Sequence, residues 1–369
     1  MSRLLKLSLS RFRNYTQLSW KPDAPLLVLT GENGCGKTNL LEAVSLLAPG
    51  RGLRAAPLPQ LGQSGSLEWA VSARIESLDE QLEIGTGTQQ DGQGTRRVSL
   101  CNGKRLRGQS AWSQALSAVW ITPQMDRLFS DGAAGRRRFL DRLVMAVSPQ
   151  HTSELAAYDK AMTQRNRLLQ TRFSERTWIE GLEHSMARHA VAVAAARNET
   201  VDHLNSHTRH ALDAFSAMRL DIDCAIGNRL HTTPALAVED WLREQLQALR
   251  PQDRQKGRAS LGIHRADCTL TDLRSGNPAS MASTGQQKAL LVGLVLAHAR
   301  VVTAYRGAPP VLLLDEPLVH LDATRRASLL QSLQAFDSTV MLTGTDSAPF
   351  APLAGVAKFI SVRQGAFMP

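Results

Sequence analysis

The stretch GENGCGKT, from Gly31 to Thr38, is the feature that most limits what this chain can fold into. It follows the apolar run from Leu26 to Thr30 and precedes TNLLEAVSLLA, whose composition is typical of a helix. A loop of the form G-x-x-x-x-G-K-[ST] between a buried strand and a helix binds phosphate groups, because its backbone N–H groups turn inward and the helix N-terminus is electropositive. The pattern therefore predicts an α/β fold that binds a nucleoside triphosphate.

Each residue of this loop has an expected role. Lys37 should reach the β- and γ-phosphates, and the hydroxyl of Thr38 should hold Mg²⁺. The other residues that we expect to contact the nucleotide are Gly31, Glu32, Asn33, Gly34, Cys35, Gly36 and Asn39.

A second apolar run, VLLLDEP, supplies an acidic end to another buried strand. Four apolar residues place Asp315 and Glu316 at the carboxyl edge of a parallel sheet, where ligands bind in α/β folds. Asp315 is expected to position Mg²⁺, directly or through water, and Glu316 to act as the general base for water. Together with the phosphate loop, this run predicts a hydrolase of nucleoside triphosphates.

Size and charge restrict the class of protein further. A chain of 369 residues exceeds the usual size of one domain, so two domains or lobes are expected. Its 43 Lys and Arg outnumber its 33 Asp and Glu, giving a net charge of +10, which favours a polyanionic partner such as nucleic acid. A general basic bias of the source proteome is the alternative explanation.

The sequence points to a reducing, cytoplasmic location without a membrane anchor. The four cysteines lie far apart, with no CxxC pair, so they predict neither a zinc site nor a disulfide framework. The amino end is interrupted by Arg11 and Arg13 and is not expected to be a signal peptide. No run of eighteen consecutive apolar residues predicts a membrane span.

The pattern of elements changes along the chain. Leu5, Leu7 and Leu9 alternate with polar residues, as in a half-buried first strand. Between residues 50 and 110 short apolar stretches and the hairpin signal Asn102-Gly103 predict a mostly antiparallel β portion. Helix formers dominate residues 136–216, and residues 175–215 contain no proline, which predicts a long helix there.

The stretch PASMASTGQQKALLVGLVLAHA, from Pro278 to Ala299, admits two interpretations. Ser283 and the small residues after it are typical of a helix entrance. Alternatively, Ser283, Gly285 and Gln286 form half of an active site whose other half lies on another molecule.

Three stretches resemble the motifs of ABC-type ATPases. ASTGQ, Ala282 to Gln286, is similar to the LSGGQ signature, with Ala282 and Thr284 as departures. EPLVHLD resembles the catalytic glutamate followed by the D-loop, which makes Asp322 the D-loop aspartate. Gln124 lies where a Q-loop would sense Mg²⁺ and the γ-phosphate. The switch histidine of such enzymes is replaced by Thr345, which suits a slow hydrolase.

The spacing of these motifs selects one group of ABC-type proteins. Ser283 lies 246 residues after Lys37, a much longer interval than in transporter subunits, and such an insertion resembles the SMC-like DNA-repair ATPases. The chain is too short for their long coiled coils. It is similar to the RecF family in LSRFRNY, TGENGCGKTNLLEAV, GRGLR, GRRRFLDRLV, GIHRAD, STGQQK and HLDATRR, over essentially its whole length.

This resemblance implies an ABC-type ATPase head with a mixed β portion, interrupted by an inserted α-helical lobe. The head would comprise residues 1–125 and 250–369, and the lobe residues 126–249. It also implies an ATP-dependent homodimer in which Ser283 and Gly285 face the γ-phosphate on the other subunit, with weak ATPase activity. The implied partners are DNA at single-strand gaps and junctions, and RecO and RecR in the loading of RecA.

Several basic clusters are candidates for contact with DNA phosphates, although each could equally be a solvated or salt-bridged surface. They are Arg51, Arg54, Lys104, Arg105, Arg107, Arg136, Arg137 and Arg138. His264 in GIHRAD has either a packing role or a role near the nucleotide. An energy-coupling ATPase of transport and a structural DNA-binding module that binds ATP are the alternative functions.

Overall fold

A mostly parallel sheet forms the centre of the structure, a computed structural model that describes residues 2–64, 66–77, 80–91, 94–106, 116–209 and 214–368. Four of its strands, over residues 26–30, 118–121, 311–314 and 340–344, are buried apolar runs, as expected for parallel strands covered on both faces. All neighbours pair in parallel except the last strand of the chain, which is antiparallel. In order of pairing, they are β14 (Ala366–Met368), β13 (Lys358–Arg363), β3 (Leu26–Thr30), β12 (Val340–Gly344), β11 (Val311–Leu314) and β8 (Ala118–Ile121).

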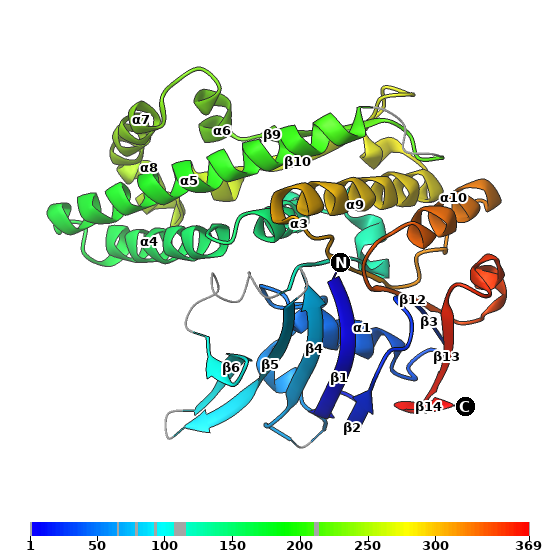
Figure 1. Cartoon of the computed structure of the whole chain (residues 1–369). Coiled ribbons are helices and arrows are strands. Elements are labelled where there is room, and N and C mark those ends of the chain that lie inside the picture. The colour runs from blue at the N-terminus through cyan, green and yellow to red at the C-terminus, as the bar shows by residue number, and fades with distance from the viewer. Residues whose placement is uncertain are drawn as a thin grey trace.

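An antiparallel sheet lies to the left of β3, β12 and β13 in Figure 1 and contains the first strand of the chain. Asn102 and Gly103 both have positive φ, 49° and 75°, as a two-residue hairpin turn between β6 and β7 requires. The antiparallel β portion expected here is therefore present. In order of pairing, its strands are β2 (Tyr15–Trp20), β1 (Ser2–Phe12), β4 (Ala70–Ser77), β5 (Glu80–Asp91), β6 (Gly94–Cys101) and β7 (Lys104–Arg105).

Helix α1 (Lys37–Leu46) lies between the two sheets, with contacts to β1 and β4 on one side and to β11 and β12 on the other. This position explains why its buried residues surround the helix instead of forming one stripe. The phosphate loop, which leads into α1, is therefore supported by both sheets.

Helix α9 (Thr284–Arg306) packs against β8, α3 (Ala133–Val147) and α5 (Arg176–Thr208). Within the described residues it is the one helix long and apolar enough to cross a membrane, but 78% of that stretch is buried inside the protein. We therefore interpret α9 as a core helix.

A helical lobe extends away from the sheets, with α4 (His151–Thr171) packed along α5 (Figure 1). The smaller helices α6 (Ala225–Leu230), α7 (Ala235–Ala248) and α8 (Arg250–Lys256) complete it. The lobe has its own apolar core. It also contains a fully buried guanidinium, that of Arg165, which donates to Glu183 at 2.9 Å and to Asp253 at 2.7 Å.

The buried clusters suggest other limits for the lobe than 126 and 249. Helix α3 contributes Phe139 and Leu140 to the main core, whereas the lobe core runs from Tyr158 to Ala266. Helix α3 contacts α9 as well as α4 and α5, whereas α8 contacts α4 and α7, and the turn Ile263–Arg265 contacts α5. We propose a lobe of about residues 150–266.

The remaining elements connect these parts. The hairpin of β9 (Met218–Asp223) and β10 (Asp267–Asp272) pairs antiparallel, and α10 (Ala323–Gln334) follows β11. Five short 3₁₀ turns lie in the described segments: η1 (Leu58–Gln60), η2 (Pro123–Arg127), η3 (Ile263–Arg265), η4 (Ala279–Met281) and η5 (Ala348–Leu353).

Candidate nucleotide-binding site

Four predicted motifs meet at one edge of the parallel sheet. Because β8, β11, β12 and β3 are parallel neighbours, the segments after them emerge at the same edge. The phosphate loop follows β3, Asp315 and Glu316 follow β11, Thr345 follows β12, and Gln124 follows β8. The topology thus brings together residues up to 314 positions apart, from Gly31 to Thr345.

Thr38 and Asp315 meet directly. The Thr38 hydroxyl lies 2.9 Å from Oδ1 and 3.0 Å from Oδ2 of Asp315, whose residue is only 4% exposed. A hydroxyl and a carboxylate are oxygen donors of the kind that Mg²⁺ prefers. These two residues therefore fit the magnesium ion that the motifs imply.

Thr343 supports both acidic residues and was not predicted. Its hydroxyl donates to Oδ1 of Asp315 at 2.7 Å and accepts the backbone N–H of Glu316 at 2.9 Å. It is fully buried at the end of β12. The sequence signal was a polar residue ending an apolar run, in VMLTG, but the pairing of β12 with β11 was needed to give it a role.

Glu316 adopts an unusual backbone conformation. Its φ is 49°, in the left-handed region that residues other than glycine rarely occupy. Such strain persists where the surrounding structure imposes it, often at functional sites. Here the hydrogen bond from Glu316 N–H to Thr343 and the following Pro317 hold the turn, leaving the carboxyl group half-buried at the sheet edge.

Within the phosphate loop, the side chain of Lys37 is bonded to the backbone of the same loop. The ammonium of Lys37 donates to the carbonyl oxygens of Gly31 at 2.6 Å and Glu32 at 2.9 Å. An ammonium has three N–H donors, so Lys37 can bind a phosphate oxygen without giving up both carbonyls. Gly34 has a φ of 82° and nothing within 4 Å of the position of a Cβ, so the loop is open on the side where phosphate would approach.

The β1–β2 hairpin supports the phosphate loop through side-chain hydrogen bonds to its backbone. Asn14 donates to the carbonyl of Cys35 at 3.0 Å, and Tyr15 donates to that of Gly36 at 3.1 Å. Burial, together with the nearby Cys35, raises the pKa of Tyr15, so its hydroxyl stays a neutral donor. A Cβ at Gly36 would lie 2.6 Å from Asn14 Nδ2, which requires glycine there.

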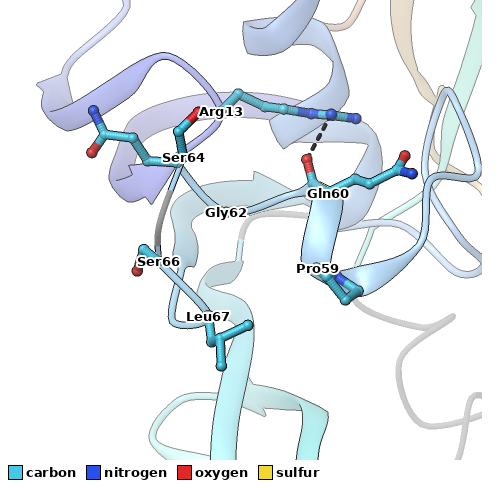
Figure 2. A pocket seen from close by; sticks show the side chains of 8 residues that line it. Arg13, Pro59, Gln60, Gly62, Ser64, Ser66 and Leu67 are labelled. Carbon is cyan, nitrogen blue, oxygen red and sulfur yellow. Dashed lines mark hydrogen bonds between the residues drawn. The ribbon is translucent and has the colours of Figure 1, made fainter.

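Arg13 fixes this hairpin to α1. It donates to both carboxylate oxygens of the buried Glu42 at 2.8 Å, and to the carbonyl of Gln60 at 2.7 Å. Figure 2 shows the Arg13 side chain across the top of a cleft of about 490 Å³, with its bond to Gln60 dashed. Arg13 therefore joins the first hairpin, α1 and the segment around η1.

Asn39 is held by its neighbours within the chain. Its amide donates to Asn14 Oδ1 at 2.7 Å, and its Oδ1 accepts from Arg54 at 2.8 Å. Its expected contact with the nucleotide therefore stays a prediction.

The helix-entrance interpretation of Ser283 is confirmed in detail. Ser283 is the N-cap of α9, and its hydroxyl accepts the backbone N–H of Gln286 while Gln286 Oε1 accepts the N–H of Ser283. Ser283 and Gln286 are both exposed. In the described part of the chain they bond to each other and not to the phosphate loop, so a nucleotide-binding role would require another molecule.

The signature and the D-loop lie against each other. A Cβ at Gly285 would lie 2.8 Å from the carbonyl oxygen of His320, so a larger residue there would displace the D-loop. Asp322 caps α10 by accepting the N–H of Arg325 at 2.8 Å.

The Q-loop segment is joined to the signature helix. Gln124 is exposed in η2, and two residues later Asp126 accepts a hydrogen bond of 2.7 Å from the fully buried Lys288 of α9. The role of Gln124 toward Mg²⁺ stays a prediction.

Comparisons with known proteins agree with this geometry. Residues 3–351 match the family model described as the RecF/RecN/SMC N terminal domain. The "DNA replication and repair protein RecF" of Mesorhizobium japonicum is 43% identical, covering 100% of this chain and 98% of the relative. That of Brucella suis biovar 1 is 40% identical over 98% of this chain and 94% of its own.

The chain belongs to the RecF family.

Solved structures confirm the fold. The recombination mediator protein RecF-ATPrS in the RecFOR pathway has a TM-score of 0.86 at 22% identity, with 99% of this chain and 97% of that chain covered. An Smc head domain from Pyrococcus furiosus has a TM-score of 0.53 at 15% identity, with 100% and 95% covered. The predicted ABC-type head with a helical insertion is therefore confirmed for this RecF-family chain.

The structure divides the predicted DNA contacts of the RecF-family chain into engaged and exposed residues. Arg54 is paired with Glu42, Arg136 with Asp267, and Arg137 donates to the carbonyl of Ala266. These three guanidinium groups have structural roles and are poor candidates for phosphate contacts. Arg51, Lys104, Arg105 and Arg138 are exposed, and Arg107 lies outside the described residues.

Of the two roles considered for His264, the structure shows the packing role. Its Nδ1 lies 2.7 Å from the Tyr158 hydroxyl, and its Nε2 is 3.1 Å from the carbonyl of Ala259, both in the lobe. Burial is the main reason that the pKa of His264 is lowered, so it is neutral at pH 7.

Proposed function

We propose that this RecF-family protein is an ATP-hydrolysing, DNA-binding protein of DNA replication and repair, and that it forms a homodimer when it binds ATP. The observation that carries the proposal is the convergence of Thr38, Asp315 and Glu316 beside the phosphate loop. Family membership supports it, since relatives of similar length are described as DNA replication and repair proteins.

In the proposed reaction Lys37 and the loop N–H groups bind the β- and γ-phosphates of ATP. Glu316 accepts a proton from the attacking water, whose oxygen bonds to the γ-phosphorus while the bond to the bridging oxygen of the departing ADP breaks. A magnesium ion held by Thr38 and Asp315, with Gln124 as a further ligand, would neutralise charge on the phosphates. Thr345, in place of a switch histidine, supplies no titratable group, which supports slow turnover.

Dimerisation would complete the site. Ser283 and Gly285 begin an exposed helix N-terminus, whose positive end and N–H groups would stabilise a γ-phosphate held by a second copy. ATP would then hold two subunits together, and hydrolysis would release them.

The proposed biological setting follows the family resemblance. The protein would act in the cytoplasm at single-strand gaps and junctions in DNA, helping RecO and RecR to load RecA. Arg51, Lys104, Arg105 and Arg138 are the exposed candidates for phosphate contacts.

The decisive experiment compares the size of the protein with ADP and with ATP, alone and with gapped DNA. Wild type should dimerise with ATP, Lys37→Ala should remain monomeric, and Glu316→Gln should accumulate as an ATP-bound dimer without hydrolysis. An ATP-dependent dimer of the Lys37→Ala variant would overturn the assignment of the phosphate loop. DNA affinity should also fall with salt, by a log–log slope of about −0.9 per phosphate contact on duplex DNA.

A further inference from the structure

A hollow of about 160 Å³ opens beside Glu316, and four segments form its wall. The turn after β11 contributes Glu316, Leu318 and Val319, and the end of β12 with the following turn contributes residues 343–346. Arg326 contributes from α10, and the rest of the wall is η5. The general base thus shares a hollow with an arginine ten residues further along the chain.

More acidic than basic side chains line this hollow. Glu316 and Asp346 bring two carboxyl groups, and Arg326 is the one basic side chain among the lining residues, all of which the structure describes. The Thr345 hydroxyl donates to Asp346 at 2.9 Å, so Asp346 already has a partner. Glu316 is the carboxyl group for which no side-chain partner is described.

The neighbouring side chains of Arg325 and Arg326 differ in whether they have an ion-pair partner. Arg325 is paired with Asp322 at 3.2 Å, whereas the guanidinium of Arg326 has no ion pair or hydrogen bond within the described ranges of the chain. The backbone N–H of Arg326 donates to the Asp322 carbonyl at 2.9 Å, and Leu329, Leu330 and Leu333 anchor the following turns of α10 in the core. The backbone of Arg326 is therefore fixed, while its side chain lines the same hollow as Glu316.

We propose that Arg326 is a positioning residue for ATP hydrolysis, whose guanidinium holds the Glu316 carboxylate in the orientation that accepts a proton from the attacking water. The guanidinium keeps its own protons, since an arginine is not deprotonated in such a step. It would supply the positive group that Thr345 cannot provide. This inference rests on the proposed ATPase function.

The test compares Arg326→Ala, Arg326→Gln and Arg326→Lys with wild type and with Arg300→Ala, a change of the same kind at an exposed arginine on α9. For Arg326→Ala and Arg326→Gln we expect kcat for ATP hydrolysis to fall roughly tenfold, as for a weakened general base. KM should change by less than about twofold, because ground-state binding of ATP is untouched. Arg326→Lys should recover much of kcat because it restores the positive charge, and Arg300→Ala should match wild type.

Glu316→Gln separates failure of this inference from failure of the proposed function. If wild type does not hydrolyse ATP, or Glu316→Gln is fully active, the proposed function fails. If Glu316→Gln is inactive while both Arg326→Ala and Arg326→Gln retain wild-type kcat, only the role of Arg326 fails. Loss of the ATP-dependent dimer at unchanged kcat would also overturn it, because Arg326 would then belong to the subunit contact.

Discussion

Thr343 shows how a single hydroxyl can hold two functional residues at once. It bonds to the Asp315 carboxylate and to the Glu316 backbone in a fully buried position. Without the Thr343 hydroxyl, the buried carboxylate oxygen of Asp315 and the backbone N–H of Glu316 would each lose a hydrogen-bond partner. The orientation of both acidic residues thus depends on a residue outside the motifs that the sequence makes recognisable.

We predict that Thr343→Val lowers the free energy of unfolding by about 1–3 kcal/mol, the cost of leaving buried polar groups unsatisfied. It should also slow ATP hydrolysis, because the turn at Glu316 loses its anchor. Denaturant unfolding and steady-state hydrolysis measure the two effects. Thr343→Ser keeps the hydroxyl and serves as the control, so equal behaviour of the valine and serine variants would contradict the assigned role.

Residues within one continuous motif could be predicted from the sequence, whereas their supports could not. Lys37, Thr38, Asp315 and Glu316 are recognisable because the chemistry of phosphate and metal binding requires these residue types at fixed local spacing. Thr343 is far from its partners along the chain and has no such pattern. Likewise, the ion pair of Arg136 with Asp267 and the hydrogen bond of Arg137 to the Ala266 carbonyl become visible only when α3 is placed beside the segment that begins β10.

For the helices and strands, a turn that depends on local sequence was predicted correctly, whereas the register of the first strand and the end of the long helix were not. The Asn102-Gly103 turn formed as predicted because its backbone requirement is local. The first strand contains a register irregularity between Leu4 and Lys6, so Leu4 is buried and Leu5 only partly buried, contrary to simple alternation. The long helix predicted within residues 175–215 ends at Thr208.

One contact between elements connects the Q-loop segment to the signature helix. Lys288 is fully buried on α9, and its ammonium is bonded to Asp126 of η2 at 2.7 Å. Beside it, the Ser130 hydroxyl donates to Gln287 at 3.1 Å. Any movement of η2 on binding nucleotide should therefore be transmitted to the start of α9.

Asp126→Ala is expected to lower the free energy of unfolding by about 3–5 kcal/mol, because it leaves the buried ammonium of Lys288 uncompensated. Lys288→Met removes the charge while retaining much of the side-chain volume and should cost less. The double variant should be more stable than Asp126→Ala alone. Urea unfolding of the three variants provides the measurement, and a strictly additive double variant would show that the pair is not coupled.

For the molecule as a whole, the two halves of the proposed active site share no hydrogen bond among the described residues. Lys37, Thr38, Asp315 and Glu316 lie together at one sheet edge, while Ser283 is exposed at the start of α9 and has its hydrogen bonds with Gln286. A helix entrance and a phosphate-binding half-site are compatible, because the capping box leaves the Gly285 N–H without a partner among the described residues. Sequence alone suggested this division through family resemblance, and it could not show which surface each half occupies.

This division leads to a test that uses two inactive chains. Lys37→Ala should disable the phosphate loop, and Ser283→Arg should block the signature by bulk and by loss of the N-cap. Each chain alone should form no ATP-dependent dimer, because both composite sites are damaged. In an equal mixture, a heterodimer has one site with an intact phosphate loop and an intact signature, so we expect an ATP-dependent dimer and up to half of the wild-type hydrolysis per dimer. Differently tagged chains, co-purified with ATP and with ADP, measure this directly.

Thermal unfolding of each variant without nucleotide checks that both are folded, and Ser283→Ala provides a smaller change at the same position. A mixture of folded variants that forms no ATP-dependent heterodimer would mean that the entrance to α9 only begins a helix.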